Sequence, residues 1–265
     1  MTKKLEKHHK SDMPQGAHPK QHKSRVWIWI VGVIALAGIS LLLYPTAENW
    51  LYHRGVAAQK QDFMNRSAKA SGQDGLPYDD LYQFLKSENE NMYLTGQSGL
   101  VDAFSYQTRG IDLSAYGIED DCIGYIEIPS IGIQLPIYLG ANTDNMKKGA
   151  VHLTQTSYPI GGPNTNAVIA AHRTVVRDMF RNIDKIQIGD VVYITNFRER
   201  LTYKAVEIKI IDPTDVNQIK IQEGRDLVTL VSCHPPGTTN QRYVVYCERV
   251  SDGLDTTATD SQPTE

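Results

Sequence analysis

Three residues of this sequence could together form a nucleophilic site: Cys233, His172 and Arg242. Cys233 ends an apolar, strand-like run from Asp226 to Ser232, and Arg242 begins a second such run, RYVVYCERV, after a Pro- and Gly-containing loop. His172 follows a third apolar run, Ala167 to Ala171. A thiolate is a strong nucleophile, an imidazole exchanges protons near neutral pH, and a cation can lower the pKa of a thiol or bind an oxyanion. The pattern predicts a cysteine nucleophile, a base and a cation at three strand ends.

Each of these residues has an ordinary explanation when it is taken singly. A lone cysteine is more often a buried thiol, a lone histidine a structural residue, and a lone arginine a salt-bridge partner. His234 adjoins Cys233, but side chains alternate along a strand, so we expect it to point away and to modulate the site at most. A zinc site at Cys233 and His234 lacks the usual spacing of ligand pairs, and we expect neither a metal nor a cofactor.

In their order along the chain, these segments resemble the sortases, the membrane-anchored cysteine transpeptidases of Gram-positive bacteria. TLVSC, which ends at Cys233, stands where that family has TLxTC, with Ser232 in place of the usual Thr. The resemblance covers roughly residues 116 to 250. It includes four further segments: GYIEIPSIGIQLPIYLG, HLTQTSYPIGG, NAVIAAHRT and IGDVVYI. His152, in the second of these, also matches a family position, and we expect a structural role for it.

The resemblance implies a transpeptidation at an LPxTG-like sorting signal. Cys233 would attack the peptide carbonyl to give a thioester, His172 would protonate the departing amine, and Arg242 would hydrogen-bond the carbonyl oxygen. An incoming amine would then resolve the thioester. The implied partners are pilin or surface-protein substrates and an amine acceptor, which is a pilin lysine or a peptidoglycan cross-bridge.

A segment upstream of these motifs looks like the lid of class C sortases, which polymerise pilins. That lid carries an Asp, usually a Pro, and then an aromatic residue; here the order is Asp102, Ala103, Phe104, so the Pro is missing. As a lid, Asp102 would pair with Arg242 and Phe104 would cover Cys233. The ordinary explanation is a surface Asp and a packed Phe in a loop.

Three functions therefore remain open at this point. The first is a pilin-polymerising transpeptidase, and the second is a sortase that anchors surface proteins to peptidoglycan. The third is a non-catalytic, membrane-tethered β-domain that binds a partner, for which the three residues would be a coincidence. Whether residues 98–110 occupy the cleft above Cys233 would separate the first two.

The charge pattern predicts a single-pass membrane protein and gives no sign of nucleic-acid binding. The formal net charge is −3, yet lysines crowd the N-terminus ahead of an uncharged stretch from Val26 to Tyr44. This stretch is close to the roughly 20 residues that cross a bilayer, with Trp27 and Trp29 near one end. The positive-inside rule places the N-terminus in the cytoplasm and the remainder outside. A cleaved signal peptide is the competing interpretation, but the apolar run is longer than usual for one.

The sequence divides into five predicted regions. They are a basic cytoplasmic tail (1–25), a transmembrane anchor (26–44), a helical stalk with the lid segment (45–115), a catalytic barrel (116–250) and a polar tail (251–265). In the stalk, the apolar spacing of Tyr78, Leu81, Tyr82 and Leu85 predicts a helix that packs on the barrel.

The fold class that we expect is mainly β: a closed, sortase-type barrel with short helices, preceded by the transmembrane helix and the helical and lid segment. Strands are predicted at Val191–Thr195 and Leu201–Ile211, and a short helix at Val176–Ile186 with three apolar side chains facing inward, Met179, Phe180 and Ile183. Cys122 and Cys247 lie in the first and last strands. We expect free buried thiols there, although a disulfide is possible outside the membrane.

Overall fold

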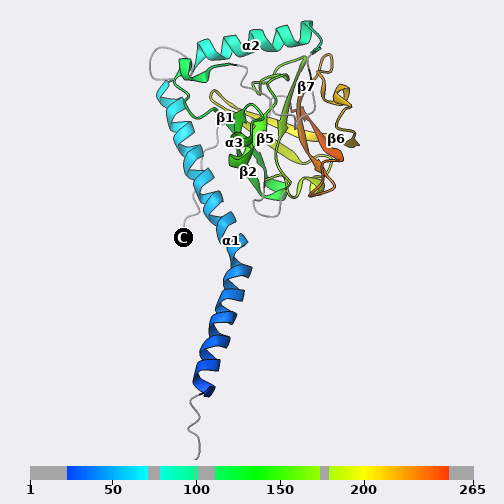
Figure 1. Ribbon diagram of the computed structural model, residues 1–265. Coiled ribbons are helices and arrows are strands. Elements are labelled where there is room, and N and C mark those ends of the chain that lie inside the picture. The colour runs from blue at the N-terminus through cyan, green and yellow to red at the C-terminus, as the bar shows by residue number, and fades with distance from the viewer. Residues whose placement is uncertain (1–22, 71–77, 99, 101–110, 174–178, 251–265) are drawn as a thin grey trace, which may run out of the picture. The chain divides into compact units, whose positions relative to one another are not determined.

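The computed structural model describes residues 23–70, 78–98, 100, 111–173 and 179–250 of the 265-residue chain (Figure 1). The chain separates into two compact units, Met1–Tyr44 and Pro45–Glu265. The predicted lid residues Asp102 and Phe104 and the polar tail lie outside the described residues.

The second unit is built on eight strands, which close into a barrel in the order β1-β2-β3-β4-β7-β8-β6-β5. Two neighbouring pairs, β2–β3 and β4–β7, are parallel, and the other pairs are antiparallel. The predicted closed barrel is thereby confirmed. The strands are β1 Cys122–Ile128, β2 Ile133–Leu139, β3 Ala150–His152, β4 Thr165–Ala170, β5 Val191–Asn196, β6 Arg200–Ile211, β7 Asp226–His234 and β8 Gln241–Arg249.

Short helices connect the strands, and two longer helices precede them. The longer ones are α1 Lys23–Ala70 and α2 Asp79–Leu94; the shorter ones are η1 Leu113–Tyr116, η2 Pro129–Ile131, α3 Thr143–Lys148, η3 Ile183–Lys185 and η4 Val216–Ile219.

Closure of the barrel depends on a close approach between β1 and β5. Gly124 of β1 lies opposite Asn196 of β5, and a Cβ atom at position 124 would collide with the carbonyl oxygen of Thr195. A residue without a side chain is therefore needed at this seam.

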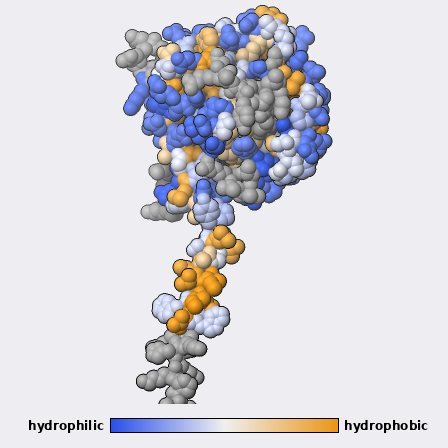
Figure 2. All heavy atoms as spheres, viewed as in Figure 1, coloured by the Kyte–Doolittle hydropathy of each residue, from blue (hydrophilic) through white to orange (hydrophobic). Residues whose placement is uncertain are grey.

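Helix α1 has two parts of different character. Its apolar N-terminal part, which begins at Val26, is exposed along its length and is long and apolar enough to cross a membrane (Figure 2). Beyond Pro45, one side of the helix packs on the barrel. Phe63 contacts the ring of Tyr125 edge-on, and Lys60 forms a 2.8 Å ion pair with Glu127.

Helix α2 packs on the barrel through the stripe that the sequence predicts. Leu81 and Leu85 are fully buried. One turn later, Asn89 exchanges two hydrogen bonds with the backbone of Tyr158: its Nδ2 donates to the carbonyl at 3.2 Å, and its Oδ1 accepts from the N–H at 2.7 Å. A buried amide with both ends satisfied fixes the helix against the β3–β4 connection.

The predicted helix at Val176–Ile186 is wrong for the part that the structure describes. Between residues 179 and 186 the only regular structure is η3, Ile183–Lys185. The N–H of Phe180 donates to the carbonyl of His172 at 3.0 Å, eight residues away, which is incompatible with an α-helix at that position. The three apolar side chains are nonetheless buried as predicted.

The thiols of Cys122 and Cys247 are free and buried, as the sequence predicts. Burial raises the pKa of Cys122 to about 12 and also raises the pKa of Cys247. Neither is a nucleophile near neutral pH.

His152 is a structural residue at the end of β3. It is fully buried, its Nε2–H donates to the carbonyl of Ser157 at 2.9 Å, and its ring packs against that of Tyr158. Burial lowers the pKa of His152 to about 4, although the hydrogen bond to Ser157 acts in the opposite direction.

This depressed pKa predicts a loss of stability in acid. Between about pH 6.5 and pH 4 the unfolded chain binds a proton at His152 that the folded chain does not, so stability falls by about 2–3 kcal/mol as the pH falls through this window. His152→Gln keeps a donor for Ser157 but cannot titrate. Urea unfolding at pH 7 and pH 4 should show a smaller loss for the variant than for the unmodified chain, and equal losses would contradict the assignment.

Candidate active site

The pairing of β7 with β8 places two of the predicted site residues directly opposite each other. The strands are antiparallel, and Cys233 is the register partner of Arg242. Directly opposed residues on antiparallel strands present their side chains on the same face, within about 5.5 Å at Cβ. The thiol and the base of the arginine side chain therefore lie side by side.

The pairing of β7 with β4 brings in the third residue. These strands are parallel, with Ala170 opposite Val231, and the N–H of Ala171 donates to the carbonyl of Val231 at 3.3 Å. His172 and Cys233 each lie two residues beyond this last pair, in the same direction along the parallel strands. The two strands therefore deliver the imidazole and the thiol to the same end of the barrel.

Hydrogen bonds on the other face hold these strand ends together. The buried hydroxyl of Ser232 donates to the carbonyl of Ala171 at 2.8 Å, so the Ser that replaces the usual Thr still supplies the hydroxyl. Two residues further along each strand, the guanidinium of Arg173 lies 3.5 Å from Nδ1 of His234. The residue after His172 and the residue after Cys233 are thus in contact.

Arg173 is itself firmly anchored. Its side chain is buried, its Nη2 forms a 2.7 Å ion pair with Asp184, and its Nε donates to the carbonyl of Arg181. The ring of His234 packs near that of Tyr243, on the face opposite Cys233. The prediction that His234 points away from the thiol is confirmed, and its contact with Arg173 was not predicted.

Arg242 is oriented by the backbone of its own loop. Its Nη1 donates to the carbonyls of Thr239 and Gln241, at 2.9 and 3.1 Å, and the residue is buried. The exposed carboxylate of Asp212 has a lowered pKa, mainly because the Thr214 hydroxyl and N–H donate to it and in part because of the Arg242 charge. The guanidinium is thus a cation whose orientation is fixed by the backbone of its own loop.

The protonation of the site follows from burial. His172 is half-buried, and this burial lowers its pKa below the ordinary value, so the neutral imidazole predominates at pH 7. Cys233 is partly exposed, unlike the other two cysteines. An accessible thiol beside a neutral base and a cation can be deprotonated and can attack an electrophile.

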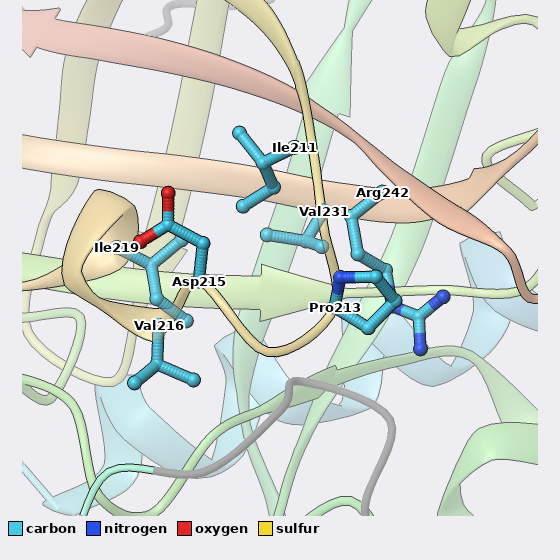
Figure 3. A pocket seen from close by; sticks show the side chains of 7 residues that line it. All are labelled: Ile211, Pro213, Asp215, Val216, Ile219, Val231 and Arg242. Carbon is cyan, nitrogen blue, oxygen red and sulfur yellow. The ribbon is translucent and has the colours of Figure 1, made fainter.

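A small, mostly apolar pocket, which we call the groove, reaches the site at Arg242 (Figure 3). One side is formed by the strands and the other by the β6–β7 connection, residues 212–225, which we call the groove wall. Val231 precedes Cys233 by two residues and so shares its face of β7. The lining residues are Ile211, Pro213, Asp215, Val216, Ile219, Val231 and Arg242.

Comparison with known proteins points to one family. Residues 126–250 match the family model for the sortase domain. The chain is 32% identical to sortase D of Bacillus subtilis over 131 residues, which is 48% of this chain and 64% of that protein. It is 31% identical to sortase A of Streptococcus agalactiae over 241 residues, which is 89% of this chain and 88% of that protein.

Solved structures give the same result. Sortase C of Clostridium perfringens, determined with its C-terminal cell wall sorting motif, is similar with a TM-score of 0.62 at 32% identity, covering 73% of this chain and 98% of that one. The pilus-related sortase C of Group B Streptococcus has a TM-score of 0.58 at 30% identity and covers 72% and 96% of the two chains.

The exposure of the three thiols predicts which one reacts. Iodoacetamide near neutral pH should alkylate Cys233 and spare Cys122 and Cys247, because both are buried and the pKa of each is raised. Peptide mapping by mass spectrometry would locate the label. Cys233→Ala should abolish labelling without changing the melting temperature; labelling of either buried thiol while Cys233 remains unmodified would contradict the site.

Proposed function

Because the chain belongs to the sortase family of cysteine transpeptidases, we propose that it cleaves an LPxTG-like sorting signal and joins the new carboxyl end to an amine, that of a pilin lysine. The observation that supports this most directly is the register that sets Cys233 opposite Arg242, next to the strand end that carries His172.

The reaction proceeds in two halves. His172 takes the proton of the Cys233 thiol, and the thiolate attacks the scissile carbonyl while Arg242 donates hydrogen bonds to the developing oxyanion. His172 then returns the proton to the departing amine, which leaves a thioester. An acceptor amine attacks the thioester, a proton passes back through His172, and the thiol is restored.

The groove supports a peptide as the substrate. Its lining is largely aliphatic, as expected for a Leu-Pro-type signal, and it includes Arg242 and Val231, which lies on the same face of β7 as Cys233 (Figure 3). A peptide lying along it would present its carbonyl to the thiol.

Pilin joining is favoured over cell-wall anchoring by the structural relatives. The similar solved structures that match over nearly their whole length are sortases C, and one of them is described as pilus-related. Anchoring of surface proteins to peptidoglycan is the second candidate, and the similarity of nearly the whole chain to a sortase A favours it. The two are separated by the acceptor: a pilin lysine or a cross-bridge amine.

The proposed location is the cell membrane. The N-terminal apolar part of α1 would be the single-pass anchor, the basic residues before it would lie in the cytoplasm, and the barrel would face outward. In this arrangement residues 26–44 span the bilayer, 45–115 form the stalk and lid segment, and 116–250 form the catalytic domain.

Substitutions at the base and the cation test the mechanism. His172→Ala and Arg242→Ala should each lower the rate of thioester formation by on the order of 10²–10⁴-fold, because each removes a group that acts only in the transition state. Rapid-quench mass spectrometry with an LPxTG peptide would measure the rate of thioester formation in each variant.

Arg242→Lys is the matched control for charge. It keeps the cation but cannot reproduce a planar guanidinium with several donors, so it should restore only part of the rate. Near-normal rates in either alanine variant would show that the residue has no part in the chemistry.

The lid remains a prediction. If Asp102 pairs with Arg242 and Phe104 covers Cys233, the double change Asp102→Ala, Phe104→Ala should speed iodoacetamide labelling of Cys233 at least tenfold, because a closed state favoured by roughly 2 kcal/mol leaves a few per cent of molecules open. The melting temperature should barely change. Labelling at the unmodified rate would favour an ordinary surface loop and the anchoring function.

A further inference from the structure

The groove wall is held by a row of hydrogen bonds along its second half. Nδ2 of Asn166 donates to the carbonyls of Ile219 and Lys220, at 3.0 and 3.1 Å, and the hydroxyl of Tyr246 donates to the carbonyl of Gln218 at 2.7 Å. Asn166 and Tyr246 are buried residues of the barrel strands β4 and β8. These bonds hold residues 218–220 of the wall against the barrel.

A further bond comes from outside the barrel. The backbone N–H of Ile221 donates at 2.8 Å to Oε1 of Gln97, which lies 124 residues earlier in the chain. Nε2 of the same side chain donates to the carbonyl of Gln155, in the β3–β4 connection, at 3.1 Å. One amide therefore links the segment after α2 to the groove wall and to the barrel at the same time.

Gln97 is held in this position at a conformational cost. Its φ is 51°, in the left-handed region that residues other than glycine rarely adopt, and the residue is 93% buried, with an exposed fraction of 7%. Three residues later Leu100 is also buried, and its N–H donates to the carbonyl of Gln97. A strained, buried polar residue persists where the surroundings fix it, and such residues collect at functional sites.

We propose that Gln97 is a positioning residue for the substrate groove. Through the N–H of Ile221 it holds the wall that carries Ile219 and Val216 at the distance from Val231 that a sorting-signal peptide needs. This inference rests on the proposed function, and it concerns binding of the peptide and not the chemistry at Cys233.

The expected signature is a change in KM without a change in kcat. In Gln97→Ala the wall samples positions that do not fit the peptide, and if it fits only about a tenth of the time the apparent affinity falls about tenfold. The rate at which iodoacetamide alkylates Cys233 should stay within about twofold, because the thiol and its neighbours on β4 and β8 are untouched. Exchange of the Ile221 amide with deuterium should become at least tenfold faster.

Two further variants separate the amide link from other effects. Gln97→Gly accepts the positive φ without strain, so it should show the same rise in KM if the side chain matters, and a KM like that of the unmodified chain if only the backbone does. Gln59→Ala is the matched control. Like Gln97, Gln59 links a segment that precedes the barrel to the barrel, since its Nε2 in helix α1 donates to the Tyr138 hydroxyl at 3.0 Å, but this bond does not involve the groove wall.

The experiment is steady-state kinetics of the full chain in detergent, with an LPxTG peptide as the probe and all three variants in parallel. A tenfold rise in KM for Gln97→Ala and Gln97→Gly, with Gln59→Ala unchanged, supports the proposal. An unchanged KM in Gln97→Ala, or an equal rise in Gln59→Ala, overturns it. If the unmodified chain forms no thioester, the proposed function itself fails. That result is distinct from an active chain whose KM is unchanged by substitution of Gln97.

Discussion

The site depends on one strand, β7, and on its two different pairings. Its parallel pairing with β4 aligns the ends of two strands that run in the same direction, so the residues that follow them emerge together. Its antiparallel pairing with β8 sets the start of the returning strand against the end of β7, which brings Arg242 opposite Cys233. A slip of one residue in either register would turn a side chain to the opposite face. The hydroxyl of Ser232 and the contact between Arg173 and His234 oppose such a slip where the ladder ends.

Much of this arrangement was predictable because local signals were strong. Apolar runs that end at a cysteine and a histidine, and one that begins near an arginine, indicated strand ends, and the order of the motifs supplied the family. The sequence could not show that β4 and β7 are neighbours. Between the end of β4 at Ala170 and the start of β7 at Asp226 lie 55 residues, which include the strands β5 and β6. Arg173 was missed for that reason: its partner His234 is adjacent only through the parallel pairing. Gln97 was missed because a lone glutamine in a polar turn has no distinguishing pattern.

The predicted helix at Val176–Ile186 failed for a related reason. Met179, Phe180 and Ile183 have helical spacing, and all three are buried as an amphipathic helix would require. The backbone, however, forms a tertiary hydrogen bond from the Phe180 N–H to the carbonyl of His172. A short segment gains little from forming an isolated helical turn, so a contact with the strand end can decide its conformation. The same contact helps to fix the residue that carries the imidazole. Asp102 and Phe104 lie outside the described residues, and their role remains a prediction.

Alternation along β7 lets a single strand serve packing and chemistry together. On one face, Leu230 and Ser232 are fully buried and bind the strand into the barrel. On the other, Val231 lines the groove and the thiol of Cys233 follows it.

The three cysteines show how strongly position decides reactivity in this fold. Cys122 begins β1 and Cys247 lies inside β8, and both are buried, which raises the pKa of each thiol. Cys233 lies near the end of its strand, where the ladder of hydrogen bonds ends and a loop begins. Solvent, a base and a cation can all reach its sulfur there. A position at a strand end is therefore not sufficient for reactivity, since Cys122 also lies at one; a reactive thiol needs exposure and also the two neighbours that the pairings of β7 bring to Cys233.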